Sequence, residues 1–145
     1  MNSPHLPVYI LMVLLIFAVS IPLFKKAYGR WFHVLMLCVL GSALGLSLLE
    51  LLKVNREGAY SYTFGNYEAG IGIQFLVDDF SALMTFIVLL LGFLIIMYSL
   101  KDLDHEIEPS RRYGYYTLVF LMLFSMIGMI FTNDMFNLYV FMEIL

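Results

Sequence analysis

The stretch Thr132–Leu145 carries a carboxylate, Glu143, inside a run of apolar residues. Asn133 is suited to cap a helix, and Asp134 suits its first turn, where a negative charge meets the positive end of the helix dipole. At a rise of about 1.5 Å per residue, Glu143 lies roughly 13 Å beyond Asp134. A bilayer core is about 30 Å thick, so this depth is close to its middle. An ionisable residue there costs about 3 kcal/mol or more, which makes Glu143 a candidate for proton or cation transfer.

These carboxylates also have plainer interpretations. Glu143 could be a helix-end carboxylate that reaches the membrane interface. Asp134 lies about two and a half turns before it, on the opposite face, and is either a charge at the helix N-terminus or part of an entry path. Asp78 has the same two interpretations. Asp78 and Asp79 come directly before the apolar run over 80–100 and suit a capped helix start.

The composition indicates an integral membrane protein. Hydrophobic residues make up 62% of the chain and charged residues only 13%, whereas soluble domains have about 25% charged residues. The net charge of -3 argues against nucleic-acid binding, which requires a basic surface. Cys38 is the single cysteine, so no disulfide forms within the chain. No histidine pair has metal-ligand spacing, so we expect no metal site. We also expect no cofactor and assign no catalytic residue, because nucleotide motifs and nucleophile–base pairs are absent from the sequence.

Apolar runs of spanning length place the elements that carry these residues. The sequence predicts an all-α membrane protein, a single transmembrane region over 1–145, with four complete transmembrane helices, a partial fifth and a small outer β-hairpin. We expect the spans at 7–24, 32–52, 80–100, 115–131 and, incompletely, 134–145. The last covers about 18 Å, which is too short to cross the bilayer. We therefore expect the chain to be an N-terminal fragment, or a piece completed by another chain.

The connections between the spans differ in character. Residues 53–77 contain two alternating segments separated by Gly65, Asn66 and Gly70, which is typical of a hairpin. The alternating residues are Tyr60, Tyr62 and Phe64, then Ile71, Ile73, Phe75 and Val77. Glu50, near the end of the second span, is expected to pair with Lys53. Residues 101–112 are highly charged and are interpreted as a solvated loop or a subunit contact. In the second span, Gly41 and Gly45 suggest a helix packing face.

The distribution of Lys and Arg predicts the orientation. Six of these residues lie in the connections after the first and third spans, and two lie in the connection after the second. We therefore expect the first and third connections in the cytoplasm, with the hairpin and the N-terminus facing outward.

Residues Asn133–Glu143 resemble the fifth-helix motif of the antiporter-like membrane subunits. These subunits occur in respiratory complex I, in Mrp-type multi-subunit sodium/proton antiporters and in membrane-bound hydrogenases. Upstream, Gly70–Ile73 followed by Val77–Leu83 resembles the family's junction between the hairpin and the third helix. The resemblance covers Tyr60–Leu145 well and the first two spans only by pattern.

The resemblance implies that Glu143 is the family's membrane glutamate. In the family, this residue couples to a lysine on the seventh helix, and protons or cations pass along a polar axis at mid-membrane. The chain stops before that helix, which places autonomous transport in question. The resemblance also implies an outward N-terminus, in agreement with the Lys and Arg counts.

We therefore expect a fragment of a proton- or cation-translocating subunit, either of a multi-subunit Na⁺/H⁺ antiporter or of a complex I-like NADH dehydrogenase or hydrogenase. Its expected partners are other membrane subunits of such an assembly, the lipid bilayer, H⁺ and Na⁺, in a prokaryotic plasma membrane. Any redox activity would belong to other subunits of a proton-translocating oxidoreductase. The alternative is a non-transporting membrane scaffold, or a truncated product that only packs against partner subunits.

The predicted orientation can be measured by cysteine labelling. In a protein whose Cys38 is replaced by Ala, Asn66→Cys and Asp104→Cys provide one probe on each predicted side. A membrane-impermeant maleimide added to intact cells should label position 66 and spare position 104 until the membrane is opened. The reverse pattern would show that the orientation derived from the basic residues is wrong.

Overall fold

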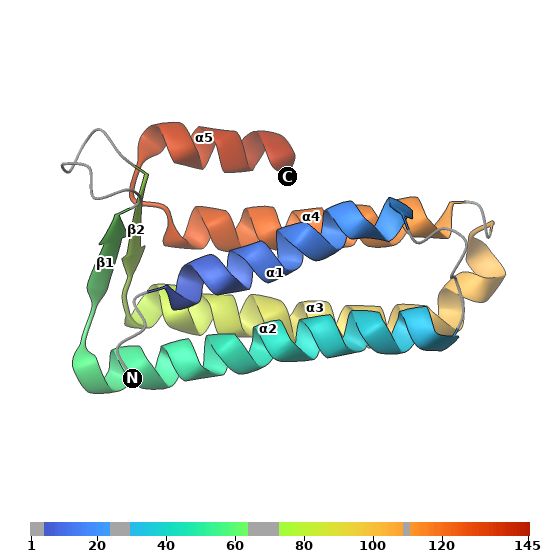
Figure 1. The fold of residues 1–145 in the computed structure, drawn as a ribbon, viewed down its shortest axis with the longest axis horizontal. Helices are drawn as coiled ribbons and strands as arrows, with labels where there is room; N and C mark the ends of the chain where they lie inside the picture. Colours follow the sequence, from blue (N-terminus) through green and yellow to red (C-terminus); the bar gives the residue numbers. More distant parts are fainter. Residues whose placement is uncertain (1–4, 24–29, 64–72, 109–110) are drawn as a thin grey trace.

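The computed structural model describes residues 5–23, 30–63, 73–108 and 111–145, which form five helices and one two-stranded sheet (Figure 1). The helices are α1 (Leu6–Ser20), α2 (Arg30–Glu57), α3 (Asp79–Glu106), α4 (Arg112–Phe131) and α5 (Met135–Ile144). Helices α2, α3 and α4 are long and apolar enough to cross a membrane, and so is α1 together with the residues up to Leu23. Helix α5 is a shorter apolar helix of 10 residues. The predicted fold class is therefore confirmed.

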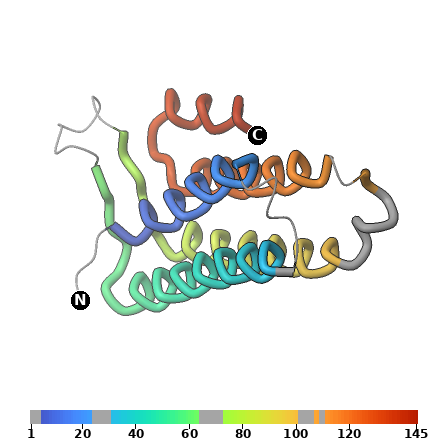
Figure 2. Tube along the Cα trace, turned by 45° about the vertical axis from the view of Figure 1, so that its right-hand side comes forward, coloured from blue at the N-terminus to red at the C-terminus, as the bar shows by residue number. Residues whose placement is uncertain are grey.

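The four long helices form an antiparallel bundle in which α1 packs against α2 and α4, and α3 packs against α2 and α4. In Figure 1, α1 and α4 form one layer and α2 and α3 the other, while α5 lies on the far side of α4. Figure 2 shows the same arrangement from a second direction. Apolar side chains fill the interior, among them Leu14, Met36, Leu89 and Phe120, which are completely buried. Many other large apolar residues lie on the outer faces, as a bilayer solvent allows.

Three helices run further than the apolar pattern predicts. Helix α2 continues from the expected end at Leu52 to Glu57, and α3 continues through residues 101–106, where the sequence predicts a loop. Helix α4 begins at Arg112, three residues before the expected start. Backbone hydrogen bonding does not require apolar side chains, and Lys, Glu and Leu all favour helix. A helix of 28 residues is about 42 Å long, so its charged ends can reach beyond the hydrocarbon core. Phe24, the predicted end of the first span, lies outside the described residues.

The predicted hairpin is present at one end of the bundle (Figure 1). Strands β1 (Tyr60–Thr63) and β2 (Gln74–Val77) pair antiparallel, with Tyr60 opposite Val77. Gly58 turns the chain from α2 into β1 with a φ of 85°, a conformation that favours glycine. Phe64, Gly65, Asn66, Gly70 and Ile71, which belong to the hairpin prediction, lie outside the described residues.

Strand β2 also holds the junction between α4 and α5. Phe75 forms an isolated bridge with Thr132, and the backbone N–H of Asn133 donates to the carbonyl of Gln74 at 3.0 Å. The Asn133 side chain donates to Gln74 Oε1 at 3.3 Å. These bonds satisfy backbone groups at a helix break, where unsatisfied groups would be costly close to hydrocarbon.

Helix α5 approaches α4 closely at Gly128. A Cβ atom at this position would overlap the ring of Phe141, and the hydroxyl of Ser125 donates to the backbone carbonyl of Phe141. By contrast, Gly41 and Gly45 are exposed, and an added Cβ would have no described neighbour within 4 Å. The helix packing face predicted at Gly41 and Gly45 is therefore not used by the described residues, whereas Gly128 is required for a close approach.

Replacing Gly128 with Ala should loosen α5. The new methyl group forces the buried ring of Phe141 to move, and overpacking of this kind typically costs about 1–3 kcal/mol. We expect a lower melting temperature for the purified protein in detergent. Gly41→Ala is the matched control: it adds the same methyl group to a helix where nothing is displaced, and it should leave stability unchanged or raise it slightly. Equal melting temperatures for both variants would contradict the packing described here.

Candidate functional site

Glu143 lies on the outer face of α5. The helix buries Asn137 and Phe141 toward the bundle, while Met135, Tyr139, Glu143 and most of the others remain exposed. The carboxylate accepts a hydrogen bond from the Tyr139 hydroxyl, one helical turn earlier, at 3.0 Å. Within the described residues, no Lys or Arg comes within ion-pair distance of it. Any charged partner of Glu143 must therefore approach from outside the described bundle.

The buried face of α5 contains one polar side chain. Asn137 is 7% exposed, and its amide donates to the hydroxyl of Thr132 at 3.1 Å. Asn137 also lines an apolar cavity of about 180 Å³ between α1, β2, α4 and α5, whose wall includes Phe75, Phe124 and Phe141. These contacts fix the rotation of α5, and that rotation directs Glu143 outward.

Asp134 is the N-cap of α5. Its carboxylate accepts a hydrogen bond from the backbone N–H of Phe136 at 3.1 Å, which satisfies one of the free donors at the helix start. The sequence suggests Asn133 as the cap and Asp134 as a first-turn residue. The structure shifts the cap by one position, because Asn133 is engaged by Gln74 of β2.

Asp78 precedes the first residue of α3 and exchanges hydrogen bonds with Ser81. The Ser81 N–H donates to Asp78 Oδ1 at 2.7 Å, and the Asp78 N–H donates to Ser81 Oγ at 2.8 Å. The backbone hydrogen bond from Ser81, followed by the bond from its side chain, lowers the pKa of Asp78 below its ordinary value of 3.8. A lowered pKa stabilises the fold at pH values above the ordinary one, and this stabilisation is lost as the pH falls through the pKa of the folded state.

Glu50, for which the sequence predicts only a structural role, is the most deeply buried carboxylate of the described residues. Glu50 has no exposed surface, and its Oε1 accepts a hydrogen bond from the hydroxyl of Tyr60 in β1. Its other oxygen, Oε2, has no hydrogen-bond partner among the described residues. The sequence predicted only a pairing of Glu50 with Lys53, three residues later on the same helix. The position of this glutamate inside an apolar run was the feature that could have indicated a further role.

The structure does not bring these acidic residues into one site. In Figures 1 and 2, α5 and α2 lie on opposite sides of the bundle, so Glu143 and Glu50 are apart. Asp78 and Asp134 lie at the end of the bundle that carries the hairpin, each at the start of its own helix. Over the ranges that the structure describes, no group of three His, Cys, Asp or Glu residues could hold a metal ion.

The chain is similar in sequence to known membrane subunits. Residues 64–113 match the family model described as NADH-ubiquinone oxidoreductase (complex I), chain 5 N-terminus. The chain is 31% identical to a Na(+)/H(+) antiporter subunit of Bacillus subtilis (strain 168) over 106 residues, which is 72% of this chain and 21% of the relative.

Two solved structures resemble the fold over nearly the whole chain. The membrane-bound sulfane sulfur reductase, an archaeal respiratory membrane complex, matches with a TM-score of 0.85 and 26% identity, over 95% of this chain and 28% of that one. The Mrp complex from Dietzia sp. DQ12-45-1b matches with a TM-score of 0.80 and 25% identity, over 97% and 25%.

Fold and composition therefore define an integral membrane protein built from apolar helices. Within that class, the chain resembles the N-terminal part of the antiporter-like membrane subunits, as its sequence motifs suggested. It spans about a fifth of the curated relative's length and about a quarter of each structural neighbour.

Proposed function

We propose that this chain is part of a proton- or cation-translocating subunit and contributes Glu143 as the glutamate of a Glu–Lys relay. The assembly is a multi-subunit Na⁺/H⁺ antiporter or a complex I-like dehydrogenase or hydrogenase. The observation that carries the proposal is a carboxylate on the outward face of an apolar helix, in a fold similar to an Mrp complex.

The position of Glu143 supports this role. The exposed face of α5 is otherwise apolar or aromatic, with Phe136, Tyr139 and Met142 around the carboxylate. A lone carboxylate on such a surface is costly in a bilayer unless protein covers it and supplies a counter-charge. The relay proposal provides that charge as a lysine ammonium on a helix packed against this face.

The chemistry follows from the balance between burial and charge pairing. While the ammonium lies beside Glu143, the ionised carboxylate is compensated and stays charged. When the ammonium moves away or loses its proton, the uncompensated carboxylate becomes costly and takes up a proton. Movement of the lysine thus alternates the protonation of Glu143. Tyr139, which already donates to the carboxylate, holds the side chain in one position during this exchange.

The stable position of α5 supports a relay on this helix. The α4–α5 junction is bonded to β2, Asp134 caps the helix, and the Phe141 ring packs against Gly128. Transfer of a proton between groups requires their separation to be kept within a fraction of an ångström, and packed helices meet this requirement better than loops do. We propose that other membrane subunits of the assembly and the lipid bilayer cover the remaining apolar surface.

Glu143→Gln in the full-length protein within its assembly should abolish ion translocation. The amide keeps the shape and polarity of the side chain but cannot exchange a proton. Glu143→Asp keeps the charge and shortens the reach by one methylene group, so we expect partial activity. Proton and sodium flux should be measured in vesicles, together with recovery of the intact complex.

Glu108→Gln is the matched control, because Glu108 is an exposed carboxylate outside the spans, with Arg111 at 4.0 Å, and its loss should leave the flux unchanged. If Glu143→Gln assembles normally and transports at the parent rate, the relay is wrong. That result would favour the alternative, a membrane scaffold that only packs against partner subunits.

A further inference from the structure

Glu50 is a buried carboxyl group that the proposed relay does not use. It lies on α2, seven residues before the end of a helix long and apolar enough to span the membrane, and no part of it is exposed. Burying a carboxylate is costly unless it is paired and hydrogen-bonded, so such a residue within a span points to a function.

The contacts of Glu50 satisfy it only in part. Tyr60 donates its hydroxyl to Oε1, and Oε2 has no hydrogen-bond partner among the described residues. Burial, and then the hydrogen bond to Glu50, raise the pKa of Tyr60 above its ordinary value of 10.0, so the phenol remains a proton donor throughout the physiological range. Lys53, almost one helical turn from Glu50, has its Nζ 4.0 Å from the centre of the Tyr60 ring. The three side chains therefore form one cluster, which we call the Glu50 cluster.

Two other charged side chains of α2 lie near the Glu50 cluster. Arg56 lines the same cavity as Lys53, and the negative charge of Glu57 acts on Tyr60. The start of α1 brings His5 and Tyr9, and His5 contacts the Tyr62 ring of β1 at 5.1 Å between centroids. Helix α3 packs against α2, and at its hairpin end the buried polar side chains Ser81 and Thr85 carry hydroxyl groups that do not titrate, while Asp78 is hydrogen-bonded to Ser81.

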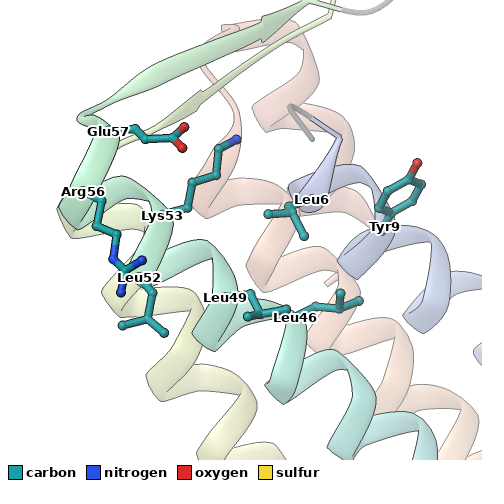
Figure 3. Close-up of a pocket in the computed structure, with 8 residues that line it drawn as sticks. All are labelled: Leu6, Tyr9, Leu46, Leu49, Leu52, Lys53, Arg56 and Glu57. Carbon is teal, nitrogen blue, oxygen red and sulfur yellow. The ribbon is translucent and has the colours of Figure 1, made fainter. Parts of the chain in front are cut away.

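A cavity lies next to the Glu50 cluster, and Lys53 is the member of the cluster that lines it. It has a volume of about 630 Å³ and lies between α1 and α2. Figure 3 shows Lys53 and Glu57 directed toward the space between the helices, with Leu46 and Leu49 further along α2 and Leu6 and Tyr9 on the α1 side. Water in this cavity can therefore reach the ammonium group of Lys53, whose side chain contacts Tyr60.

We propose that Glu50, Tyr60 and Lys53 form a second proton-binding site, which exchanges protons with water at the hairpin end of the bundle through this cavity. The ionised carboxylate is balanced by the Lys53 ammonium. The neutral carboxyl group keeps the hydrogen bond from Tyr60 and has Oε2 available to carry the proton. Because both states retain a partner, the site can take up and release a proton without rearranging the helices.

Infrared difference spectroscopy tests this proposal on the full-length protein in lipid vesicles. A step in buffer pH should produce a reversible C=O band of a protonated carboxyl group, and Glu50→Gln should remove that band. Glu57→Gln is the matched control, because Glu57 lies on the same cavity wall but is exposed, and the band should survive. A spectrum for Glu50→Gln identical to that of the parent protein would overturn the proposal.

Tyr60→Phe keeps the test decisive if Glu50→Gln fails to fold. This variant retains the carboxyl group and removes only its donor, so the band should persist at a higher frequency. An unchanged band position would show that the titrating group is not Glu50. The measurement reports proton binding and not transport, so it is independent of the relay. The same band should appear in Glu143→Gln, whose own effect is read from ion flux.

Discussion

The hydrogen bonds between β2 and the α4–α5 junction hold this structure together at its hairpin end. A helix that stops and restarts exposes backbone groups, and close to a bilayer water does not satisfy them freely. Gln74 and Phe75 of β2 supply partners to Asn133 and Thr132, and Asp134 caps the helix that follows. The hairpin thus determines where α5 begins, and through α5 the position of Glu143.

The packing between α4 and α5 then determines which way Glu143 faces. Phe141 occupies the space left by the missing side chain of Gly128, and Ser125 bonds to its carbonyl, so this face of α5 is turned inward. The carboxylate two residues later consequently lies on the outward face. On the opposite side of the bundle, the same hairpin contributes Tyr60 to Glu50. The two-stranded sheet therefore contacts the junction that precedes the helix of Glu143 and also supplies the hydrogen-bond donor of Glu50.

Much of this architecture could be predicted from the sequence, because the membrane imposes simple patterns. Apolar runs of spanning length identified the helices, and the alternation around Tyr60 and Phe75 identified the hairpin. The helix ends were predicted less well, since charged residues such as Lys101 and Glu106 continue a helix beyond the apolar run. The Glu50–Tyr60 contact could not be predicted, because it depends on how β1 folds back over α2. The role of Glu143 remains a prediction based on its position and on the family resemblance.

We expect Glu143 to lie in a water-poor layer at mid-membrane depth, and two carbodiimides can test this placement directly. The full-length protein in its membrane is treated either with dicyclohexylcarbodiimide, which partitions into hydrocarbon, or with a water-soluble carbodiimide and an amine. Modified carboxyl groups are then located by mass spectrometry. Glu143 should react with the apolar reagent and be spared by the water-soluble one, with the opposite pattern at Glu108. Modification of Glu143 by the water-soluble reagent as fast as Glu108 would contradict this placement.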